Sequence, residues 1–221
     1  MTASRVVAID GPAGSGKSTL AIGLARELRL PYINTGLMYR ALAAAAIDAG
    51  VSVDDQDGLV ELMRGLRFMV TGAQSPSLEV EGYGQEELTS LQVEANVSAV
   101  ARHPAVRELM RRAQRALGDD GAVMEGRDIG SIVFPDAAVK LYLVAPEVDR
   151  ADRRAEERSS VDEQVVDALR DRDRADAATN PYVPPEGATV LDTGVLGIEE
   201  TLRQALAAVR THAPWLVEAL S

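Results

Sequence analysis

Short apolar runs alternate with stretches of helical periodicity along most of this chain. The runs fall at 5–10, 31–33, 122–124, 139–144 and 189–191, and each has the length of a strand buried inside a sheet. Between the runs, apolar residues recur at every third or fourth position, which is the spacing of one helix face. Strands that alternate with helices predict an α/β fold of three layers, in which helices flank a central parallel sheet.

The helical stretches have recognisable ends. Thr35 is expected to cap the helix that follows the second strand, and Gly50 to end it. Two short runs at Phe68–Val70 and Leu78–Glu81 lie among turn residues, and they predict a small β-hairpin inserted between helices. The spacing predicts helices at 20–28, 35–50, 54–66, 87–101, from 104 onward, 146–158, 161–175 and 198–209.

The length and composition fit one globular domain with a modest insertion. The chain has 221 residues, 46% of them hydrophobic, and no cysteine, so disulfides, thiolate zinc sites and cysteine nucleophiles are excluded. With 23 basic and 34 acidic residues its net charge is −11, which disfavours a protein that coats nucleic acid. We find no signal-peptide layout and no apolar run of the ~20 residues that a membrane span needs, so we expect a cytoplasmic protein.

The turn after the first strand carries a phosphate-binding motif. Residues 11–18 read Gly-Pro-Ala-Gly-Ser-Gly-Lys-Ser and match G-x-x-x-x-G-K-[S/T] between a predicted strand and a predicted helix. In such a P-loop the backbone N–H groups and the helix N-terminus face the phosphates. Lys17 is expected to reach the β- and γ-phosphates, and Ser18 to offer its hydroxyl to Mg²⁺. The predicted ATP-binding residues are Gly11, Pro12, Ala13, Gly14, Ser15, Gly16, Lys17, Ser18 and Thr19.

The rest of the chain favours a small-molecule kinase among the P-loop proteins. Neither Lys17 nor Lys140 lies in the Asn-Lys-x-Asp motif that reads guanine in GTPases, and 23.5 kDa is small for a motor. Arg40 and Arg127 follow the second and third strands, and the carboxyl ends of parallel strands line one crevice. We therefore expect both arginines to meet the P-loop and bind an acceptor phosphate; the alternative is that each is a solvated surface charge.

A charged helix near residue 150 carries Arg150, Arg153, Arg154 and Arg158, interleaved with acidic residues. Arg150, Arg154 and Arg158 share one face at i,i+4 spacing. Two interpretations stay open. The helix is either a salt-bridged surface helix, or a lid whose arginines close over ATP and stabilise the charge in transfer.

Five motifs together resemble one family. They are Ile9–Ser18, Thr35–Arg40, Glu125–Gly130, Val133–Asp136 and Arg172–Asp176, in this order over nearly the whole chain. With them the chain resembles the bacterial cytidylate kinases of the nucleoside monophosphate kinase group. The resemblance implies a single P-loop kinase domain, residues 1–221, that phosphorylates CMP and dCMP from ATP with Mg²⁺. It also implies a β-containing NMP-binding insertion at about 66–94 and a short lid at about 148–160.

The resemblance also implies roles for individual residues. The cytosine contacts map onto Ser98, Arg107 and Asp128, the phosphate contacts onto Arg40 and Arg127, and the ribose contacts onto Arg172 and Asp176. The implied catalytic residues are Lys17, Arg150, Arg154 and Arg158. The implied substrate-binding residues are Thr35, Tyr39, Arg40, Ser98, Arg107, Arg127, Asp128, Arg172 and Asp176.

The chemistry of Asp128 agrees with a cytosine substrate. A carboxylate accepts a hydrogen bond from the amino group of cytosine and repels the carbonyl that uracil presents in its place. The chain departs from the family at Thr179, where a further phosphate-binding arginine is common.

Two other functions stay open beside CMP phosphorylation. One is a kinase for another small acceptor, such as UMP or a shikimate-like molecule. Asp128 argues against uracil, and Ser98, Arg107 and the insertion argue against a minimal shikimate-type enzyme. The other is a nucleotide-binding regulator without an acceptor site. The expected partners are small molecules, with no nucleic acid or membrane, and the expected state is a monomer.

Overall fold

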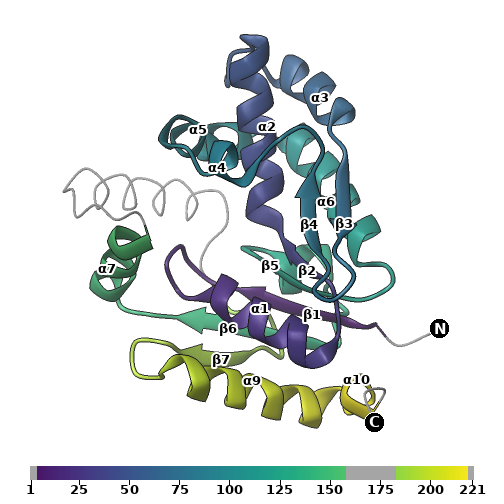
Figure 1. Ribbon diagram of the computed structural model, residues 1–221, viewed down its shortest axis with the longest axis vertical. Helices are drawn as coiled ribbons and strands as arrows, with labels where there is room; N and C mark the ends of the chain where they lie inside the picture. The colour runs from purple at the N-terminus through teal and green to yellow at the C-terminus, as the bar shows by residue number, and fades with distance from the viewer. Residues whose placement is uncertain (1–3, 158–182, 219–221) are drawn as a thin grey trace.

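A seven-stranded sheet runs through the centre of the molecule (Figure 1). The computed structural model describes residues 4–157 and 183–218. The strand order is β3-β4-β2-β5-β1-β6-β7, and every neighbouring pair is parallel except β3 with β4. The strands are β1 (Val6–Asp10), β2 (Tyr32–Asn34), β3 (Phe68–Thr71), β4 (Ser77–Val80), β5 (Ala122–Gly126), β6 (Val139–Val144) and β7 (Thr189–Asp192).

Helices cover both faces of the sheet, as the alternating pattern predicts. One face carries α1, α9 and α10, and the other carries α2 and α6 with α3, α4 and α5 stacked beyond them (Figure 1). The helices are α1 (Lys17–Leu28), α2 (Thr35–Ala49), α3 (Gln56–Gly65), α4 (Gln85–Leu88), α5 (Leu91–Ala101), α6 (Pro104–Gly118), α7 (Glu147–Glu157), α9 (Ile198–His212) and α10 (Trp215–Glu218). Within the described ranges, no helix is both long and apolar enough to cross a membrane.

Strand β1 lies inside the sheet, between β5 and β6, and is buried on both faces. It pairs with β5 on one side and β6 on the other, so its side chains meet helices above and below. Val7 and Ile9 belong to the core beneath α1 and α9, whereas Ala8 belongs to the core beneath α2 and α6. A continuous apolar run, with no polar alternation, is the sequence pattern that such a central strand requires. Because the P-loop follows β1, it lies at the carboxyl ends of the strands, between β5 and β6.

The predicted β-hairpin is confirmed, and it is joined to the central sheet. β3 and β4 form an antiparallel pair, and β4 then pairs in parallel with β2 at Tyr32 and Ser77. The Tyr32 backbone N–H also donates to the carbonyl oxygen of Pro76 at 2.8 Å. The hairpin therefore extends the main sheet beyond β2, and the sheet is not purely parallel.

Two local predictions were wrong. The expected helix at 87–101 is broken into α4 and α5, because Ser90 leaves the helix and its Oγ caps α5 by accepting from the Val93 N–H at 3.3 Å. Thr35 does not cap α2. Asn34 occupies the cap position with an extended backbone, and the Thr35 hydroxyl donates instead to the Glu125 carbonyl on β5 at 2.7 Å.

A short π-helical turn, η1 (Ile129–Val133), follows β5 and was not predicted. Turns of this kind put one extra residue into each hydrogen-bonded ring, and they occur often at functional sites. Here the carbonyl of Asp128 accepts from the N–H of Val133 at 3.1 Å. The helix expected at 161–175 lies outside the described residues.

Candidate active site

The P-loop wraps between β1 and α1 at the carboxyl edge of the sheet. Gly16 caps α1 in the left-handed region at φ 81°, a conformation that glycine adopts without steric cost. A Cβ on Gly14 would lie 2.6 Å from the carbonyl oxygen of Arg150, so the backbone of α7 approaches the loop too closely for any side chain there. Both glycines are therefore required by the shape of the loop.

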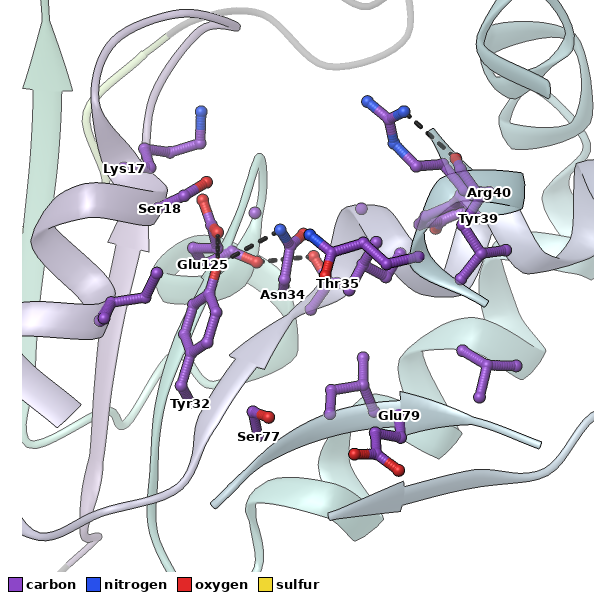
Figure 2. A pocket seen from close by; sticks show the side chains of 18 of the residues that line it. Lys17, Ser18, Tyr32, Asn34, Thr35, Tyr39, Arg40, Ser77, Glu79 and Glu125 are labelled. Carbon is purple, nitrogen blue, oxygen red and sulfur yellow. Dashed lines mark hydrogen bonds between the residues drawn. The ribbon is translucent and has the colours of Figure 1, made fainter. Parts of the chain in front are cut away.

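Two side chains of the loop turn back to one carbonyl. The buried Ser15 hydroxyl donates to Pro12 O at 2.9 Å, and the Lys17 ammonium donates to the same oxygen at 2.7 Å. The hydrogen bond from Ser15 closes the loop on itself, and Lys17 extends from it into the cavity (Figure 2). The loop is thus preorganised around a cation, as a phosphate site should be.

Helix α7 holds the outer side of the P-loop through arginines. Arg150, 8% exposed, donates from Nη1 to Ala13 O at 3.0 Å. Arg153 donates from Nη1 to the hydroxyl of Thr193 at 3.1 Å and from Nη2 to the Thr193 carbonyl at 2.6 Å. The Thr193 hydroxyl donates to Ser15 O at 3.1 Å. Arg150 and Arg153 therefore bond to the P-loop and to Thr193 at its side, and the choice between a salt-bridged surface helix and a lid stays open.

A cavity of about 1130 Å³ opens at the carboxyl ends of β1, β2 and β5. It is wide enough for two small ligands side by side, because typical ligand sites occupy about 300–1,000 Å³. The predicted residues that line it are Ala13, Gly14, Gly16, Lys17, Ser18, Thr19, Thr35, Tyr39, Arg40, Ser98, Arg107, Arg127 and Asp128. The expected convergence of Arg40, Arg127 and the P-loop on one cleft is confirmed.

Some predicted residues lie elsewhere. Gly11, Pro12 and Ser15 are buried in the body of the loop. Arg150 packs on the P-loop backbone and is not among the residues that line the cavity. The part of the chain that the structure describes does not include the Arg154 side chain or Arg158, Arg172, Asp176 and Thr179.

Arg40 is held by the segment that follows the hairpin. The residue is 8% exposed, and its guanidinium donates from Nη1 to Leu88 O at 3.3 Å and from Nη2 to Glu94 Oε1 at 3.3 Å. The alternative of a solvated surface charge is therefore wrong for Arg40. The Glu94 carboxylate, which sequence reasoning missed, brings a negative charge to a predicted phosphate site.

Asp128 is flanked by two arginines of α6. Arg107 and Arg111 donate from their Nη2 atoms to the same oxygen, Asp128 Oδ2, at 3.0 and 3.1 Å. Arg107 was predicted from the resemblance, but Arg111 was missed. Its only sequence signal was the i,i+4 spacing from Arg107, which places both on one helix face.

The backbone after Asp128 is anchored by Asp10, the last residue of β1. Asp10 accepts from the N–H of Ile129 at 2.8 Å and from the N–H of Gly130 at 2.7 Å. Burial raises the pKa of Asp10 to about 6, although the two backbone hydrogen bonds favour the charged form. Asp10 thereby connects the P-loop strand to the predicted cytosine-reading segment.

Glu125 is a further buried acid at the cavity, and sequence reasoning assigned it no role. It lies on β5 beside the P-loop strand, and its Oε1 accepts from the hydroxyl of Tyr32. Asn34 donates to the same hydroxyl at 3.3 Å. Burial, followed by the charge of Glu125, raises the pKa of Tyr32, so the phenol stays neutral and keeps donating. Figure 2 shows the Glu125 carboxylate near Ser18 on the P-loop side of the cavity.

Comparisons with known proteins agree with this geometry. A family model described as cytidylate kinase matches residues 7–211. A cytidylate kinase from Pelotomaculum thermopropionicum is 43% identical over 214 residues, which cover 92% of this chain and 95% of the relative. Another from Thermus thermophilus is 42% identical over 209 residues, covering 93% of this chain and 98% of the relative.

A solved structure supports the fold independently. An unliganded sugar kinase from Janibacter superposes with a TM-score of 0.51 at 18% identity, over 96% of this chain and 98% of the other. At that identity the likeness concerns the fold. The sequence matches extend over nearly the whole length at far higher identity. On this evidence the chain belongs to the cytidylate kinase family.

Proposed function

We propose that this chain transfers the γ-phosphoryl group of ATP to CMP and dCMP, giving CDP and dCDP. One observation carries the proposal: a single cavity has the P-loop lysine Lys17 on one side and the Arg107–Asp128 pair on the other. A donor site and a cytosine-reading acceptor site in one cleft are what the reaction needs. The names of the relatives agree with it.

The donor side would bind ATP through the P-loop. Backbone N–H groups at the start of α1 would face the phosphates, and Lys17 would neutralise charge on the β- and γ-oxygens as it develops. Phosphoryl transfer requires alignment and charge neutralisation with little covalent participation by the protein. Arg150 would act by fixing the P-loop backbone through Ala13 O. Direct roles for Arg150, Arg154 and Arg158 in transfer stay predictions.

The acceptor side would bind the monophosphate. Arg40 and Arg127 both line the cavity, and their planar guanidinium groups can fork onto phosphate oxygens. Asp128 would accept from the cytosine amino group, and Arg107 would donate to the ring acceptors. Thr35, Tyr39 and Ser98 complete the wall on this side. The ribose contacts of Arg172 and Asp176 stay predictions from the resemblance.

The residues near the P-loop fit a magnesium ion that arrives with ATP. Among the described residues no three acidic, histidine or cysteine side chains form a metal cage. Mg²⁺ needs none, because it usually keeps several waters and takes one or two protein oxygens besides the substrate phosphates. The Ser18 hydroxyl and the Glu125 carboxylate are hard oxygen donors near each other (Figure 2). When bound, the ion would help to neutralise negative charge on the phosphates, and Ser18 and Glu125 are the residues that would hold it.

The proposal also covers the insertion, the lid, the oligomeric state and the location of the protein. The hairpin and α4–α5 would form the NMP-binding insertion at about 66–94, and α7 would begin the lid at about 148–160, within a single kinase domain. A monomeric state and a cytoplasmic location stay predictions from the sequence.

An acceptor panel tests the proposal. ADP formation from ATP and Mg²⁺ would be measured with CMP, dCMP, UMP, shikimate or no acceptor. We expect turnover with CMP and dCMP at least about a hundredfold above UMP, because a buried polar mismatch discriminates strongly. Equal ADP release without any acceptor would indicate a hydrolysing regulator, and preference for UMP or shikimate would indicate another kinase.

The variant Asp128→Asn tests whether Asp128 distinguishes cytosine from uracil. Its amide can still accept from cytosine, but it can also donate to the uracil carbonyl. We expect the CMP to UMP ratio of kcat/KM to narrow. An unchanged ratio would show that Asp128 does not read the base.

A further inference from the structure

Helix α6 contacts the segment after β5 through a row of arginines, and the row continues beyond the residue expected to touch the base. Arg107, Arg111 and Arg115 are spaced at i, i+4 and i+8, so they project from one face of the helix. Arg115 donates from Nε to Val133 O and from Nη2 to Ile132 O, both at 2.9 Å. The three arginines therefore contact the two ends of η1: Arg107 and Arg111 at Asp128, and Arg115 at its last turn.

The backbone of Asp128 is thus fixed from two directions. Asp10 holds the two N–H groups that follow it, and Arg115 holds the carbonyls at the far end of η1. Rotation of the Asp128 side chain is the freedom that remains. Its direction decides which edge of a base it can meet.

Arg107 and Arg111 both bond to the Asp128 side chain, but they occupy different positions relative to the cavity. Both side chains are largely buried, 16% and 21% exposed, and Asp128 is 15% exposed. Arg107 lines the cavity, whereas Arg111 lies behind it, outside the lining residues. When Arg107 turns its donors toward a base, it loosens its hold on Asp128. A partly buried carboxylate would then lose one counter-charge, which is costly unless a second cation remains.

Arg111 supplies that second cation, although one of its own hydrogen-bond donors is left unsatisfied. Its Nε is buried without a hydrogen-bond partner in the described structure, while its Nη2 bonds to Asp128 Oδ2 at 3.1 Å. A buried donor without a partner is unfavourable, so an arginine placed here for its own packing would be a poor choice. The compensating contact is with Asp128.

We infer that Arg111 is a positioning residue for base specificity: it holds the Asp128 carboxylate oriented toward an amino-bearing pyrimidine while Arg107 engages the base. The inference rests on the proposed function, because it concerns how the same acceptor site separates cytosine from uracil. Arg111 touches neither substrate in this role.

The test compares Arg111→Gln and Arg111→Lys with the control Arg112→Gln. Arg112 is the next residue on the exposed side of α6, where its Nε bonds to Glu108 at 2.9 Å and its side chain is 69% exposed. KM and kcat would be measured for CMP and UMP, KM for ATP, and thermal stability for each variant. Direct binding of CMP would be measured by calorimetry, with no turnover.

We expect Arg111→Gln to raise the KM and Kd for CMP about tenfold, as for loss of one charged hydrogen bond, with kcat changed by less than about twofold. The kcat/KM for UMP and the KM for ATP should stay near the original values, so the CMP to UMP ratio falls about tenfold. Arg111→Lys, which keeps the charge but not the fork, should recover part of the ratio. Arg112→Gln should change none of these.

The possible outcomes distinguish the role of Arg111 from the proposed function of the chain. A folded Arg111→Gln variant with an unchanged ratio, or one that loses CMP and UMP turnover equally, would overturn the role of Arg111 and leave the proposed function intact. If Arg111→Gln does not fold, Arg111→Met replaces it as the variant without the charge, and an unchanged ratio in folded Arg111→Met overturns the role in the same way. Failure of the unsubstituted chain to phosphorylate CMP would overturn both.

Discussion

Arg127 donates a hydrogen bond from Nη1 to the backbone carbonyl oxygen of Gly11, across 2.5 Å. The bond joins an arginine of the proposed acceptor site to the first residue of the P-loop. Next to it, Asp10 of the P-loop strand accepts from the backbone beyond Asp128. The donor and acceptor sides are therefore joined by three hydrogen bonds, and in each of them the segment after β5 donates to Asp10 or Gly11.

Arg127→Met should weaken the binding of both nucleotides because of this joint. Loss of the guanidinium removes the proposed phosphate contact and also frees Gly11 O, so we expect KM for CMP to rise about tenfold or more and KM for ATP to rise about threefold. Arg40→Met is the matched control, since Arg40 bonds to Leu88 on α4 and Glu94 on α5, and its loss should raise the KM for CMP alone. Steady-state kinetics with each substrate varied would check this, and an unchanged ATP KM in Arg127→Met would contradict it.

Lys17→Ala should remove most phosphoryl transfer and leave the fold intact. Lys17 is partly exposed at the cavity and would neutralise charge on the phosphates under the proposed function, so kcat should fall about 10²-fold or more, as for loss of a preorganised charge. Lys140→Ala is the control, because that lysine is on β6 and bonds to Glu186 O at 3.3 Å. Circular dichroism would establish folding. Near-normal turnover in folded Lys17→Ala would refute the role.

The raised pKa of Asp10 predicts the direction in which the folding stability changes with pH. Its folded pKa of about 6 lies above the ordinary 3.8, so the folded chain binds the proton more tightly than the unfolded chain. The contribution of Asp10 to stability therefore rises as pH falls through about 6, and it reaches its full size of about 3 kcal/mol below the unfolded value.

Urea unfolding at pH 7.5 and pH 5.0, for the original chain and Asp10→Asn, measures this contribution. Between these pH values the original chain should gain about 1 kcal/mol relative to the variant. Asp10→Asn should be less stable at both, because its amide N–H₂ faces a backbone N–H. Equal pH dependence in the two proteins would show that Asp10 does not titrate in this range.

Glu94→Gln should tighten CMP binding. The Glu94 carboxylate bonds to Arg40 and repels an incoming phosphate, so its neutral analogue should lower the Kd of CMP by about threefold to tenfold. The same change should cost about 2 kcal/mol of stability, since a largely buried guanidinium loses one counter-charge. Calorimetry with CMP and with cytidine would distinguish the cause, because cytidine lacks the phosphate and its affinity should not change. Weaker CMP binding would instead show that Glu94 positions Arg40 for the phosphate.

Local chemistry made the P-loop predictable. Its glycines and Lys17 act within eight consecutive residues, and the strand before it is a buried apolar run. The meeting of Arg40 with Arg127 was also predictable, since both follow parallel strands whose carboxyl ends share an edge. Both features can be predicted from the order of strands and helices, without any knowledge of side-chain packing.

The partners that tune the site were not predictable in this way. Glu94 meets Arg40, and Arg111 meets Asp128, because helices far apart in sequence pack at particular angles. An arginine on a charged helix and a glutamate near a helix start have ordinary surface roles in most proteins. The Thr35 cap failed for the same reason: β5 offers a carbonyl that competes for its hydroxyl.

The pairing of β4 with β2 bears on how the protein unfolds. Leu78 and Val80 of the hairpin share one core with Ile33 and Met124, and a continuous ladder runs from β3 to β1. The proposed acceptor segment thus lacks a core of its own, and β4 joins β2 through a single residue pair, Tyr32 with Ser77, at the edge of the sheet. Opening of the hairpin would therefore expose apolar side chains of the shared core while β1 keeps a strand on either side, so amide protons of β3 and β4 should exchange with solvent before those of β1.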